Sequence, residues 1–148
     1  MTRFPCLQKG DSHVTLSPAR AVKGCHCLLI EDNKFDQKRI ERILHRTLPS
    51  RLSTVETLAD AYRALDRGMF DLVITDNALP DGLAVEFIRR LRNTDAHRDI
   101  PVIMMSDHPS EMIQTRALQA GVSAVVTRAS FTPDQLIAIM HQPELTQA

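Results

Sequence analysis

Residues 71–82 read DLVITDNALPDG, in which a short apolar run ends at Asp76 and a Pro-Asp-Gly turn follows. Continuous runs of Leu, Val and Ile without polar alternation are typical of strands that are buried on both faces of a sheet. The stretch therefore predicts a buried strand over residues 70–75 that delivers an aspartate at its carboxyl end. Such strands belong to parallel sheets whose faces are covered by helices.

The alternation of strand and helix continues on both sides of this stretch. Apolar runs predict further strands over residues 27–30, 52–55, 101–105 and 124–127. Helical spacing separates them, with limits marked by helix-starting or helix-ending residues: Pro49, Gly68, Ser110, Gly121, Thr132 and Pro133. The pattern predicts an α/β fold, an open five-stranded parallel sheet with helices on both faces. Residues 1–24 show no period, so we predict a flexible N-terminal extension there and one domain over residues 25–148.

The composition limits the functions to be considered. The chain has 148 residues, 43% hydrophobic and 24% charged, as in a soluble globular domain. Its 18 Lys and Arg balance 18 Asp and Glu, which favours neither nucleic acid nor an anionic membrane as a partner. The sequence shows neither a membrane-spanning run nor a signal-peptide pattern. Three cysteines without framework spacing predict reduced thiols and a cytoplasmic protein.

Charged and hydroxyl side chains stand at the carboxyl ends of four predicted strands. They are Glu31, Asp32, Asp76, Ser106 and Arg128. Ligands of open parallel sheets bind outside these strand ends, so we expect the five side chains to form one site. Three neighbouring carboxylates need a cation, and hard oxygen ligands favour Mg²⁺. Taken singly, a strand-end acid is usually a solvated loop residue; the combination favours the metal site.

Four segments resemble the receiver domains of two-component response regulators. They are LLIEDN at residues 28–33, DLVITDNALPDG at 71–82, MMSD at 104–107 and AGVSAVVTR at 120–128. The resemblance covers about residues 26–142. It implies a flavodoxin-like, doubly wound sheet with strand order 2-1-3-4-5, and a stand-alone phosphorelay module that catalyses at most its own phosphorylation and dephosphorylation.

The resemblance also implies roles for individual residues. Asp76 matches the phosphoacceptor, which takes a phosphoryl group from a sensor histidine kinase or histidine phosphotransfer protein and signals to a downstream protein target. Asp32, Asp76 and the backbone carbonyl of Ala78 would bind Mg²⁺, and Glu31 would hold a metal-bound water. Ser106 matches the hydroxyl residue that hydrogen-bonds a phosphoryl oxygen.

Two positions depart from the family pattern. Arg128 stands where the family has lysine, and the exchange is not conservative because a guanidinium is larger, planar and forked. It either reaches Asp76 and lowers the pKa of that carboxyl, or points into solvent. Val125 stands where the family usually has a switching Tyr or Phe, so the usual aromatic relay is absent or replaced.

These departures leave alternatives open. The chain is either an active phosphoryl switch or a phosphorylation-independent interaction module. A haloacid-dehalogenase-like phosphatase also uses a strand-end aspartate, but its second aspartate is replaced here by Ala78. A homodimer through the last two helices and the last strand is left open as well.

Three further features have simpler interpretations. Phe35 fits equally a buried contact at a helix start and a partner-facing residue. The basic cluster of Arg89, Arg90 and Arg92 is interpreted as a solvated helix end. The Cys25, His26 and Cys27 triplet lacks zinc-site spacing and is interpreted as the entry to a strand.

Overall fold

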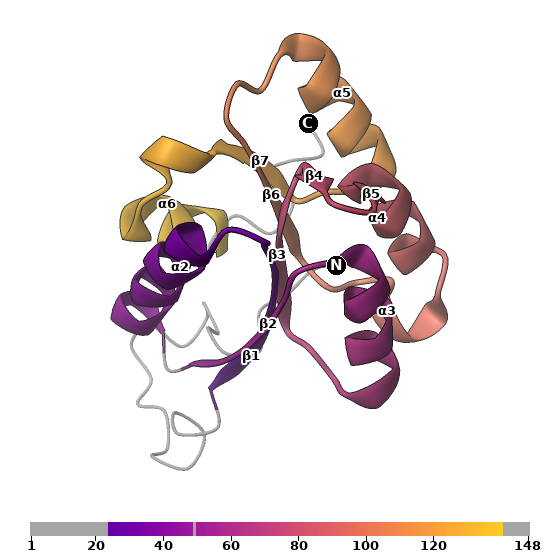
Figure 1. Cartoon of the computed structure of the whole chain (residues 1–148), viewed down its shortest axis with the longest axis horizontal. Coiled ribbons are helices and arrows are strands. Elements are labelled where there is room, and N and C mark those ends of the chain that lie inside the picture. The colour runs from indigo at the N-terminus through magenta and orange to yellow at the C-terminus, as the bar shows by residue number, and fades with distance from the viewer. Residues whose placement is uncertain (1–23, 49, 141–148) are drawn as a thin grey trace.

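The computed structural model of the chain describes residues 24–48 and 50–140. Five strands form one parallel sheet in the order β2-β1-β3-β6-β7 (Figure 1). Their bounds are β1 Cys25–Ile30, β2 Ser50–Val55, β3 Leu72–Asp76, β6 Val102–Ser106 and β7 Ala124–Thr127. This confirms the predicted parallel sheet and its 2-1-3-4-5 order. The predicted extension, apart from Gly24, and Pro49 lie outside the described residues.

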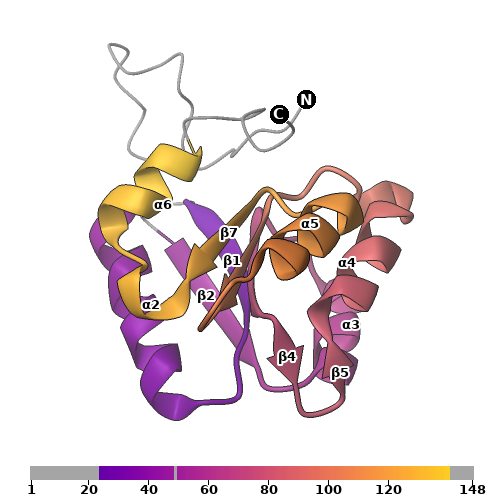
Figure 2. The same ribbon diagram turned by 90° about the horizontal axis from the view of Figure 1, so that it is seen from above.

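In the part of the chain that the structure describes, five α-helices cover the two faces of the sheet. They are α2 Lys34–Thr47, α3 Leu58–Arg67, α4 Ala84–Arg92, α5 Glu111–Ala120 and α6 Pro133–Met140. Figure 2 shows α2 and α6 on one face and α3, α4 and α5 on the other. No helix within residues 24–48 and 50–140 is long and apolar enough to cross a membrane.

Alternation along the strands divides the core into two layers. Leu28 and Ile30 of β1 pack with α3, α4 and α5, whereas Cys27 and Leu29 pack with α2 and α6. All of these strand residues are fully buried, as expected for parallel strands covered on both faces. The triplet that begins at Cys25 is therefore a strand entry, as the sequence predicted.

Polar caps begin three of the helices, and the start at Ser110 was predicted from the sequence. The side chains of Asn33, Thr57 and Ser110 accept hydrogen bonds from backbone N–H groups in the first turns of α2, α3 and α5. Gly121 ends α5 with φ 111°, in the left-handed region that favours glycine. The three N-caps fix where the connections from the preceding strands to α2, α3 and α5 end.

A short antiparallel ribbon follows β3 and was not predicted from the sequence. It pairs β4 Ala78–Leu79 with β5 Gly82–Leu83. In its turn, the carboxylate of Asp81 accepts hydrogen bonds from the backbone N–H groups of Leu58 (2.9 Å) and Ala59 (3.0 Å). The loop after Asp76 is thereby attached to the N-terminus of α3.

The interpretation of Arg92 as a solvated residue was wrong. Its guanidinium donates to the carbonyl oxygens of Gly121 (2.9 and 2.8 Å), Ile100 (2.6 Å) and Arg98 (2.9 Å). Burial lowers the pKa of Arg92. Arg92 thus ties the end of α4 to the start of β6 and to the end of α5. By contrast, Arg89 forms an exposed ion pair with Glu86.

Candidate functional site

The carboxyl ends of the central strands bring three acidic side chains together. Glu31 and Asp32 directly follow β1, and Asp76 is the last residue of β3, which neighbours β1. One carboxylate oxygen from each of the three lies within 4.8 Å of the others. Glu31 and Asp76 are buried, with 0% and 3% of their surface exposed, while Asp32 is exposed. The predicted acidic cluster is therefore formed.

Local hydrogen bonds fix the orientation of Glu31. Its backbone N–H donates to the carbonyl of Val55 (2.9 Å), which extends the β1–β2 pairing by one residue. Its Oε2 accepts from the backbone N–H of Asn33 (2.9 Å), and its carbonyl oxygen accepts from Nε2 of Gln37 (2.6 Å). The side chain is thus held toward the cluster before α2 begins.

Arg128 points into the cluster and contacts four carboxylates. Its Nη2 lies 2.7 Å from Oδ1 of Asp76, and its Nη1 lies 3.1 Å from Oδ2 of the same residue. Nη1 is also 3.3 Å from Oε1 of Glu31 and 3.2 Å from Oδ2 of Asp36, and Nε is 2.9 Å from Oδ1 of Asp107. Of the two orientations left open by the sequence, the structure has the inward one.

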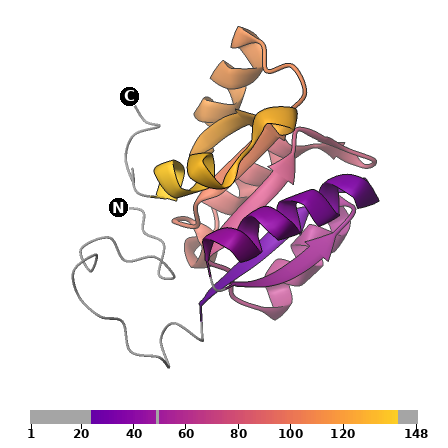
Figure 3. The ribbon, with the colours of Figure 1, turned by 90° about the vertical axis from the view of Figure 1, so that its left-hand side faces the viewer.

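Arg128 is the first residue of a short helical turn that follows β7. This turn, η3, spans Arg128–Ser130. From α2, Arg39 donates to the carbonyl oxygens of Arg128 and Phe131. Figure 3 shows α2 and α6 side by side on this face of the sheet. The sequence interpretation missed Asp36, Arg39 and Asp107, because polar residues on a helix or loop are usually solvated.

Burial sets the electrostatics of the two inner carboxyls. Burial, assisted by the neighbouring Asp76 carboxyl, raises the pKa of Glu31 to about 8, although the N–H of Asn33 opposes the rise. Burial also raises the pKa of Asp76, while the Glu31 carboxyl and the Arg128 guanidinium act to lower it. The predicted effect of Arg128 has the expected direction, because the guanidinium acts to lower the pKa of Asp76. Burial outweighs it and leaves the pKa raised.

The same carboxylates raise the pKa of Arg128. Desolvation works against its charged form, but Asp76, Glu31 and Asp107 outweigh it. The guanidinium therefore stays cationic in the centre of the cluster.

The remaining residues singled out in the sequence differ in burial and in the element that carries them. Ser106 is the last residue of β6, buried at 5% exposure, and β6 neighbours β3. Ala78 lies in β4, two residues after Asp76 and exposed. Val125 is a half-buried residue in β7. Phe35 is 74% exposed at the start of α2, so its interpretation as a buried helix-start contact was wrong.

The donor set fits a small hard cation. Carboxylate oxygens from three residues converge within 4.8 Å, and Mg²⁺ takes few carboxylates and retains waters. The exposure of Asp32 leaves one side of the cluster open to solvent, which suits a metal that keeps part of its hydration shell.

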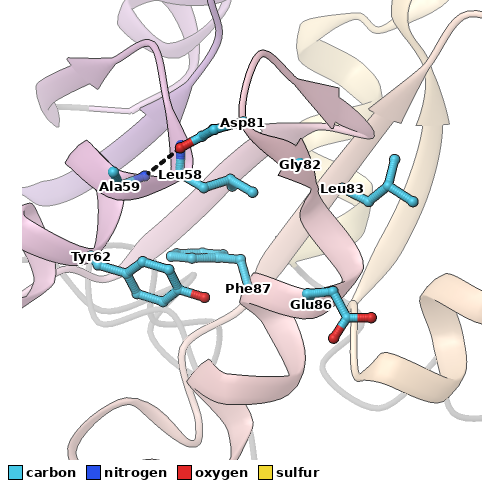
Figure 4. A pocket seen from close by; sticks show the side chains of 8 residues that line it. All are labelled: Leu58, Ala59, Tyr62, Asp81, Gly82, Leu83, Glu86 and Phe87. Atoms are coloured by element: carbon cyan, nitrogen blue, oxygen red, sulfur yellow. Dashed lines mark hydrogen bonds between the residues drawn. The ribbon is translucent and has the colours of Figure 1, made fainter.

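A separate pocket lies between α3 and α4. Its volume is about 310 Å³ and its lining includes Leu58, Tyr62, Leu83 and Phe87 (Figure 4). It shares no lining residue with the acidic cluster. The pocket is therefore separate from the acidic cluster at the strand ends.

Comparison with known proteins gives one family. Residues 27–141 match the response regulator receiver domain. The chain is 29% identical over 104 residues to the cyclic di-GMP phosphodiesterase response regulator RpfG of Xanthomonas campestris, covering 70% of this chain and 28% of that protein. It is 32% identical over 83 residues to the phosphate regulon transcriptional regulatory protein PhoB of Escherichia coli, covering 56% and 36%. The chain thus spans less than half the length of either relative.

One solved structure with the same fold is that of an isolated receiver domain. It is the receiver domain of the sensor histidine kinase PA1611 of Pseudomonas aeruginosa, with a magnesium ion coordinated in its active site cleft. The TM-score is 0.71 at 26% identity, and the match covers 81% of this chain and 97% of that one.

Proposed function

Because this chain belongs to the family of response regulator receiver domains, we propose that it accepts a phosphoryl group on Asp76 and acts as a phosphorelay switch. The donor is the phosphohistidine of a sensor histidine kinase or of a histidine phosphotransfer protein. A receiver domain is a signalling module, not a conventional enzyme. One observation carries the proposal: the buried carboxylate of Asp76 lies among two further acids and receives a guanidinium on both oxygens.

The transfer needs Asp76 as its nucleophile. One oxygen of the Asp76 carboxylate attacks phosphorus, the phosphorus–nitrogen bond breaks, and its electron pair returns to the donor imidazole. The product is an acyl phosphate on Asp76, which water later hydrolyses. Since both the carboxylate and the phosphoryl group are negative, cationic groups must offset their repulsion.

Mg²⁺ is the cofactor that the acidic cluster favours. Asp32, Asp76 and the carbonyl of Ala78 would hold it, with Glu31 on a bound water. When bound, the ion neutralises charge on the phosphoryl oxygens. The magnesium ion in the active site cleft of the PA1611 receiver domain supports this assignment.

Arg128 and Ser106 would bind the phosphoryl group once it is on Asp76. The guanidinium already touches the nucleophilic oxygens and is placed to pair with phosphoryl oxygens that arrive there. The Ser106 hydroxyl, at the end of the neighbouring strand, would donate a hydrogen bond to one of them. Both contacts would shift the residues at the ends of β6 and β7 toward the phosphoryl group. Such a shift would change the surface that a downstream protein contacts.

Labelling with a small phosphoryl donor tests the proposal. The chain is incubated with Mg²⁺ and acetyl phosphate, and its intact mass is measured. Wild type should gain one phosphoryl group, Asp76→Asn should gain none, and Asp95→Asn, the same change at an exposed acid, should behave as wild type. Labelling of Asp76→Asn at the wild-type level would disprove the nucleophile. Failure of the wild type to label would favour the interaction-module alternative.

Self-association through α5, β7 and α6 remains a prediction. Exposed apolar side chains of these two helices include Met112 and Leu118 of α5 and Ile137 of α6. Sedimentation of the phosphorylated and unphosphorylated chain would test it.

A further inference from the structure

Helix α2 holds Arg128 from two directions. We propose that Asp36 and Arg39 are positioning residues that keep the Arg128 guanidinium on Asp76. In its effect on phosphoryl transfer, this inference rests on the function proposed above. Its structural part concerns Arg128 alone and is measured separately.

The first contact fixes the side chain of Arg128. Oδ2 of Asp36 accepts a hydrogen bond from Nη1 at 3.2 Å, and the same nitrogen donates to Asp76 at 3.1 Å. Asp36 is itself half-buried, with a side-chain exposure of 17%, so the pair is partly shielded from solvent. Asp36 therefore draws the guanidinium toward α2 while the guanidinium stays bound to Asp76.

The second contact fixes the backbone from which that side chain extends. The guanidinium of Arg39 donates to the carbonyl oxygens of Arg128 and, at 3.2 Å, of Phe131. These carbonyls belong to the first residue of the η3 turn and to the residue that follows it. The backbone N–H of Phe131 also donates to the Arg128 carbonyl. Arg39 thus clamps the turn that carries Arg128.

The spacing of Asp36 and Arg39 lets both residues act on Arg128 from the same side of α2. Asp36 and Arg39 are three residues apart on α2, so they lie on one side of the helix. An arginine side chain loses considerable rotamer freedom when it is fixed, and a long side chain without partners samples several positions. Contacts at both its head and its backbone reduce the number of orientations in which the guanidinium misses Asp76.

A purely structural role is the competing explanation. Arg39 would then merely join α2 to the connection before α6, and Asp36 would act on Asp76 only through its charge. Substitution in an Arg128-free background separates these roles, because a residue that acts through Arg128 loses its effect when Arg128 is absent.

The test uses Asp36→Asn and Arg39→Gln, each alone and combined with Arg128→Ala. The controls are Glu41→Gln and Arg42→Gln, which make the same chemical changes at exposed positions of α2. With acetyl phosphate and Mg²⁺, each α2 substitution should slow labelling by about threefold to tenfold, less than the loss of Arg128 itself. In the Arg128→Ala background neither should slow it further. Persistence of the full effect there, or wild-type rates for both single variants, would overturn the proposal.

Nuclear magnetic resonance of the Arg128 side chain provides the second readout. The Nη–H signals of Arg128, whose nitrogens contact Asp36 and Asp76, should shift toward those of a free arginine in both α2 variants and stay unchanged in both controls. An unchanged signal in the variants would refute the positioning role. This measurement remains decisive if wild type fails to accept phosphate, an outcome that would refute the proposed function alone.

Discussion

Arg128 meets the carboxylate of Asp76 with two nitrogens, Nη2 at 2.7 Å from Oδ1 and Nη1 at 3.1 Å from Oδ2. A two-point contact fixes both distance and orientation, which a single ammonium group cannot do. The arginine at this position is therefore part of the cluster and not a solvent-facing replacement. Its removal leaves Glu31 and Asp76, both buried, without a shared cation.

Substitution of Arg128 should change the rate of phosphorylation. Arg128→Ala should slow labelling by acetyl phosphate by about tenfold to a thousandfold, because a cation is lost where negative charge accumulates. Arg128→Lys should label at the wild-type rate or faster, since the charge stays and the bulky fork is removed. Arg89→Ala, at an exposed ion pair, is the control. Equal rates in all four proteins would remove Arg128 from the mechanism.

Loss of Asp32 should weaken metal binding. Asp32→Asn should lower the affinity for Mg²⁺ in calorimetric titration by about tenfold or more, because a charged hard ligand is replaced by a neutral one. Asp107→Asn removes one charge from the same site at a residue that contacts Arg128 and is not a predicted ligand. Equal losses in the two variants would mean that Asp32 acts through its charge and is not a ligand.

Stability without metal should depend on pH through Glu31. The pKa of Glu31 is about 8 in the folded chain against an ordinary 4.5, so between these values only the unfolded chain has released the proton. The free energy of unfolding should therefore fall as pH rises from about 5 to about 8. Burial also raises the pKa of Asp76, so ionisation of this carboxyl lowers the free energy of unfolding as pH rises in the same way.

Urea unfolding at several pH values measures this dependence. Glu31→Gln should reduce the slope because its amide does not titrate, and Mg²⁺ should reduce it in wild type because the ion favours ionised carboxylates. A slope in Glu31→Gln as steep as in wild type would contradict the assignment.

Arg92 should contribute to stability without contributing to phosphorylation. Arg92→Ala leaves the carbonyls of Gly121 and Ile100 without their guanidinium donor, so the free energy of unfolding should fall by about 2 kcal/mol. Arg89→Ala should change it by less than about 0.5 kcal/mol, as an exposed ion pair does. Chemical unfolding measures both, and equal stability losses would contradict the difference in burial.

The acidic cluster could be predicted from the sequence, whereas the partners of Arg128 could not. Parallel strands end at one edge, so apolar runs that end at Glu31, Asp32 and Asp76 suffice to bring these residues together. The direction of the Arg128 side chain depends on Asp36 and Arg39, which sequence spacing alone does not distinguish from solvated helix residues. Arg92 was misinterpreted for the same reason.

The antiparallel ribbon of β4 and β5 was not predicted from the sequence for a different reason. Strands of two residues, such as β4 and β5, have no measurable period, and their pairing depends on the turn at Gly82, where φ is 149°.

The direction of the strands also decides how the domain could be tethered. β1 starts at Cys25, at the amino edge of the sheet, and α6 returns from the carboxyl edge to end at Met140, which shares a buried layer with Cys25. Cys25 and Met140 therefore both lie on the side of the domain opposite to Asp76. A reporter or affinity tag at either residue would leave the acidic cluster open to a phosphoryl donor.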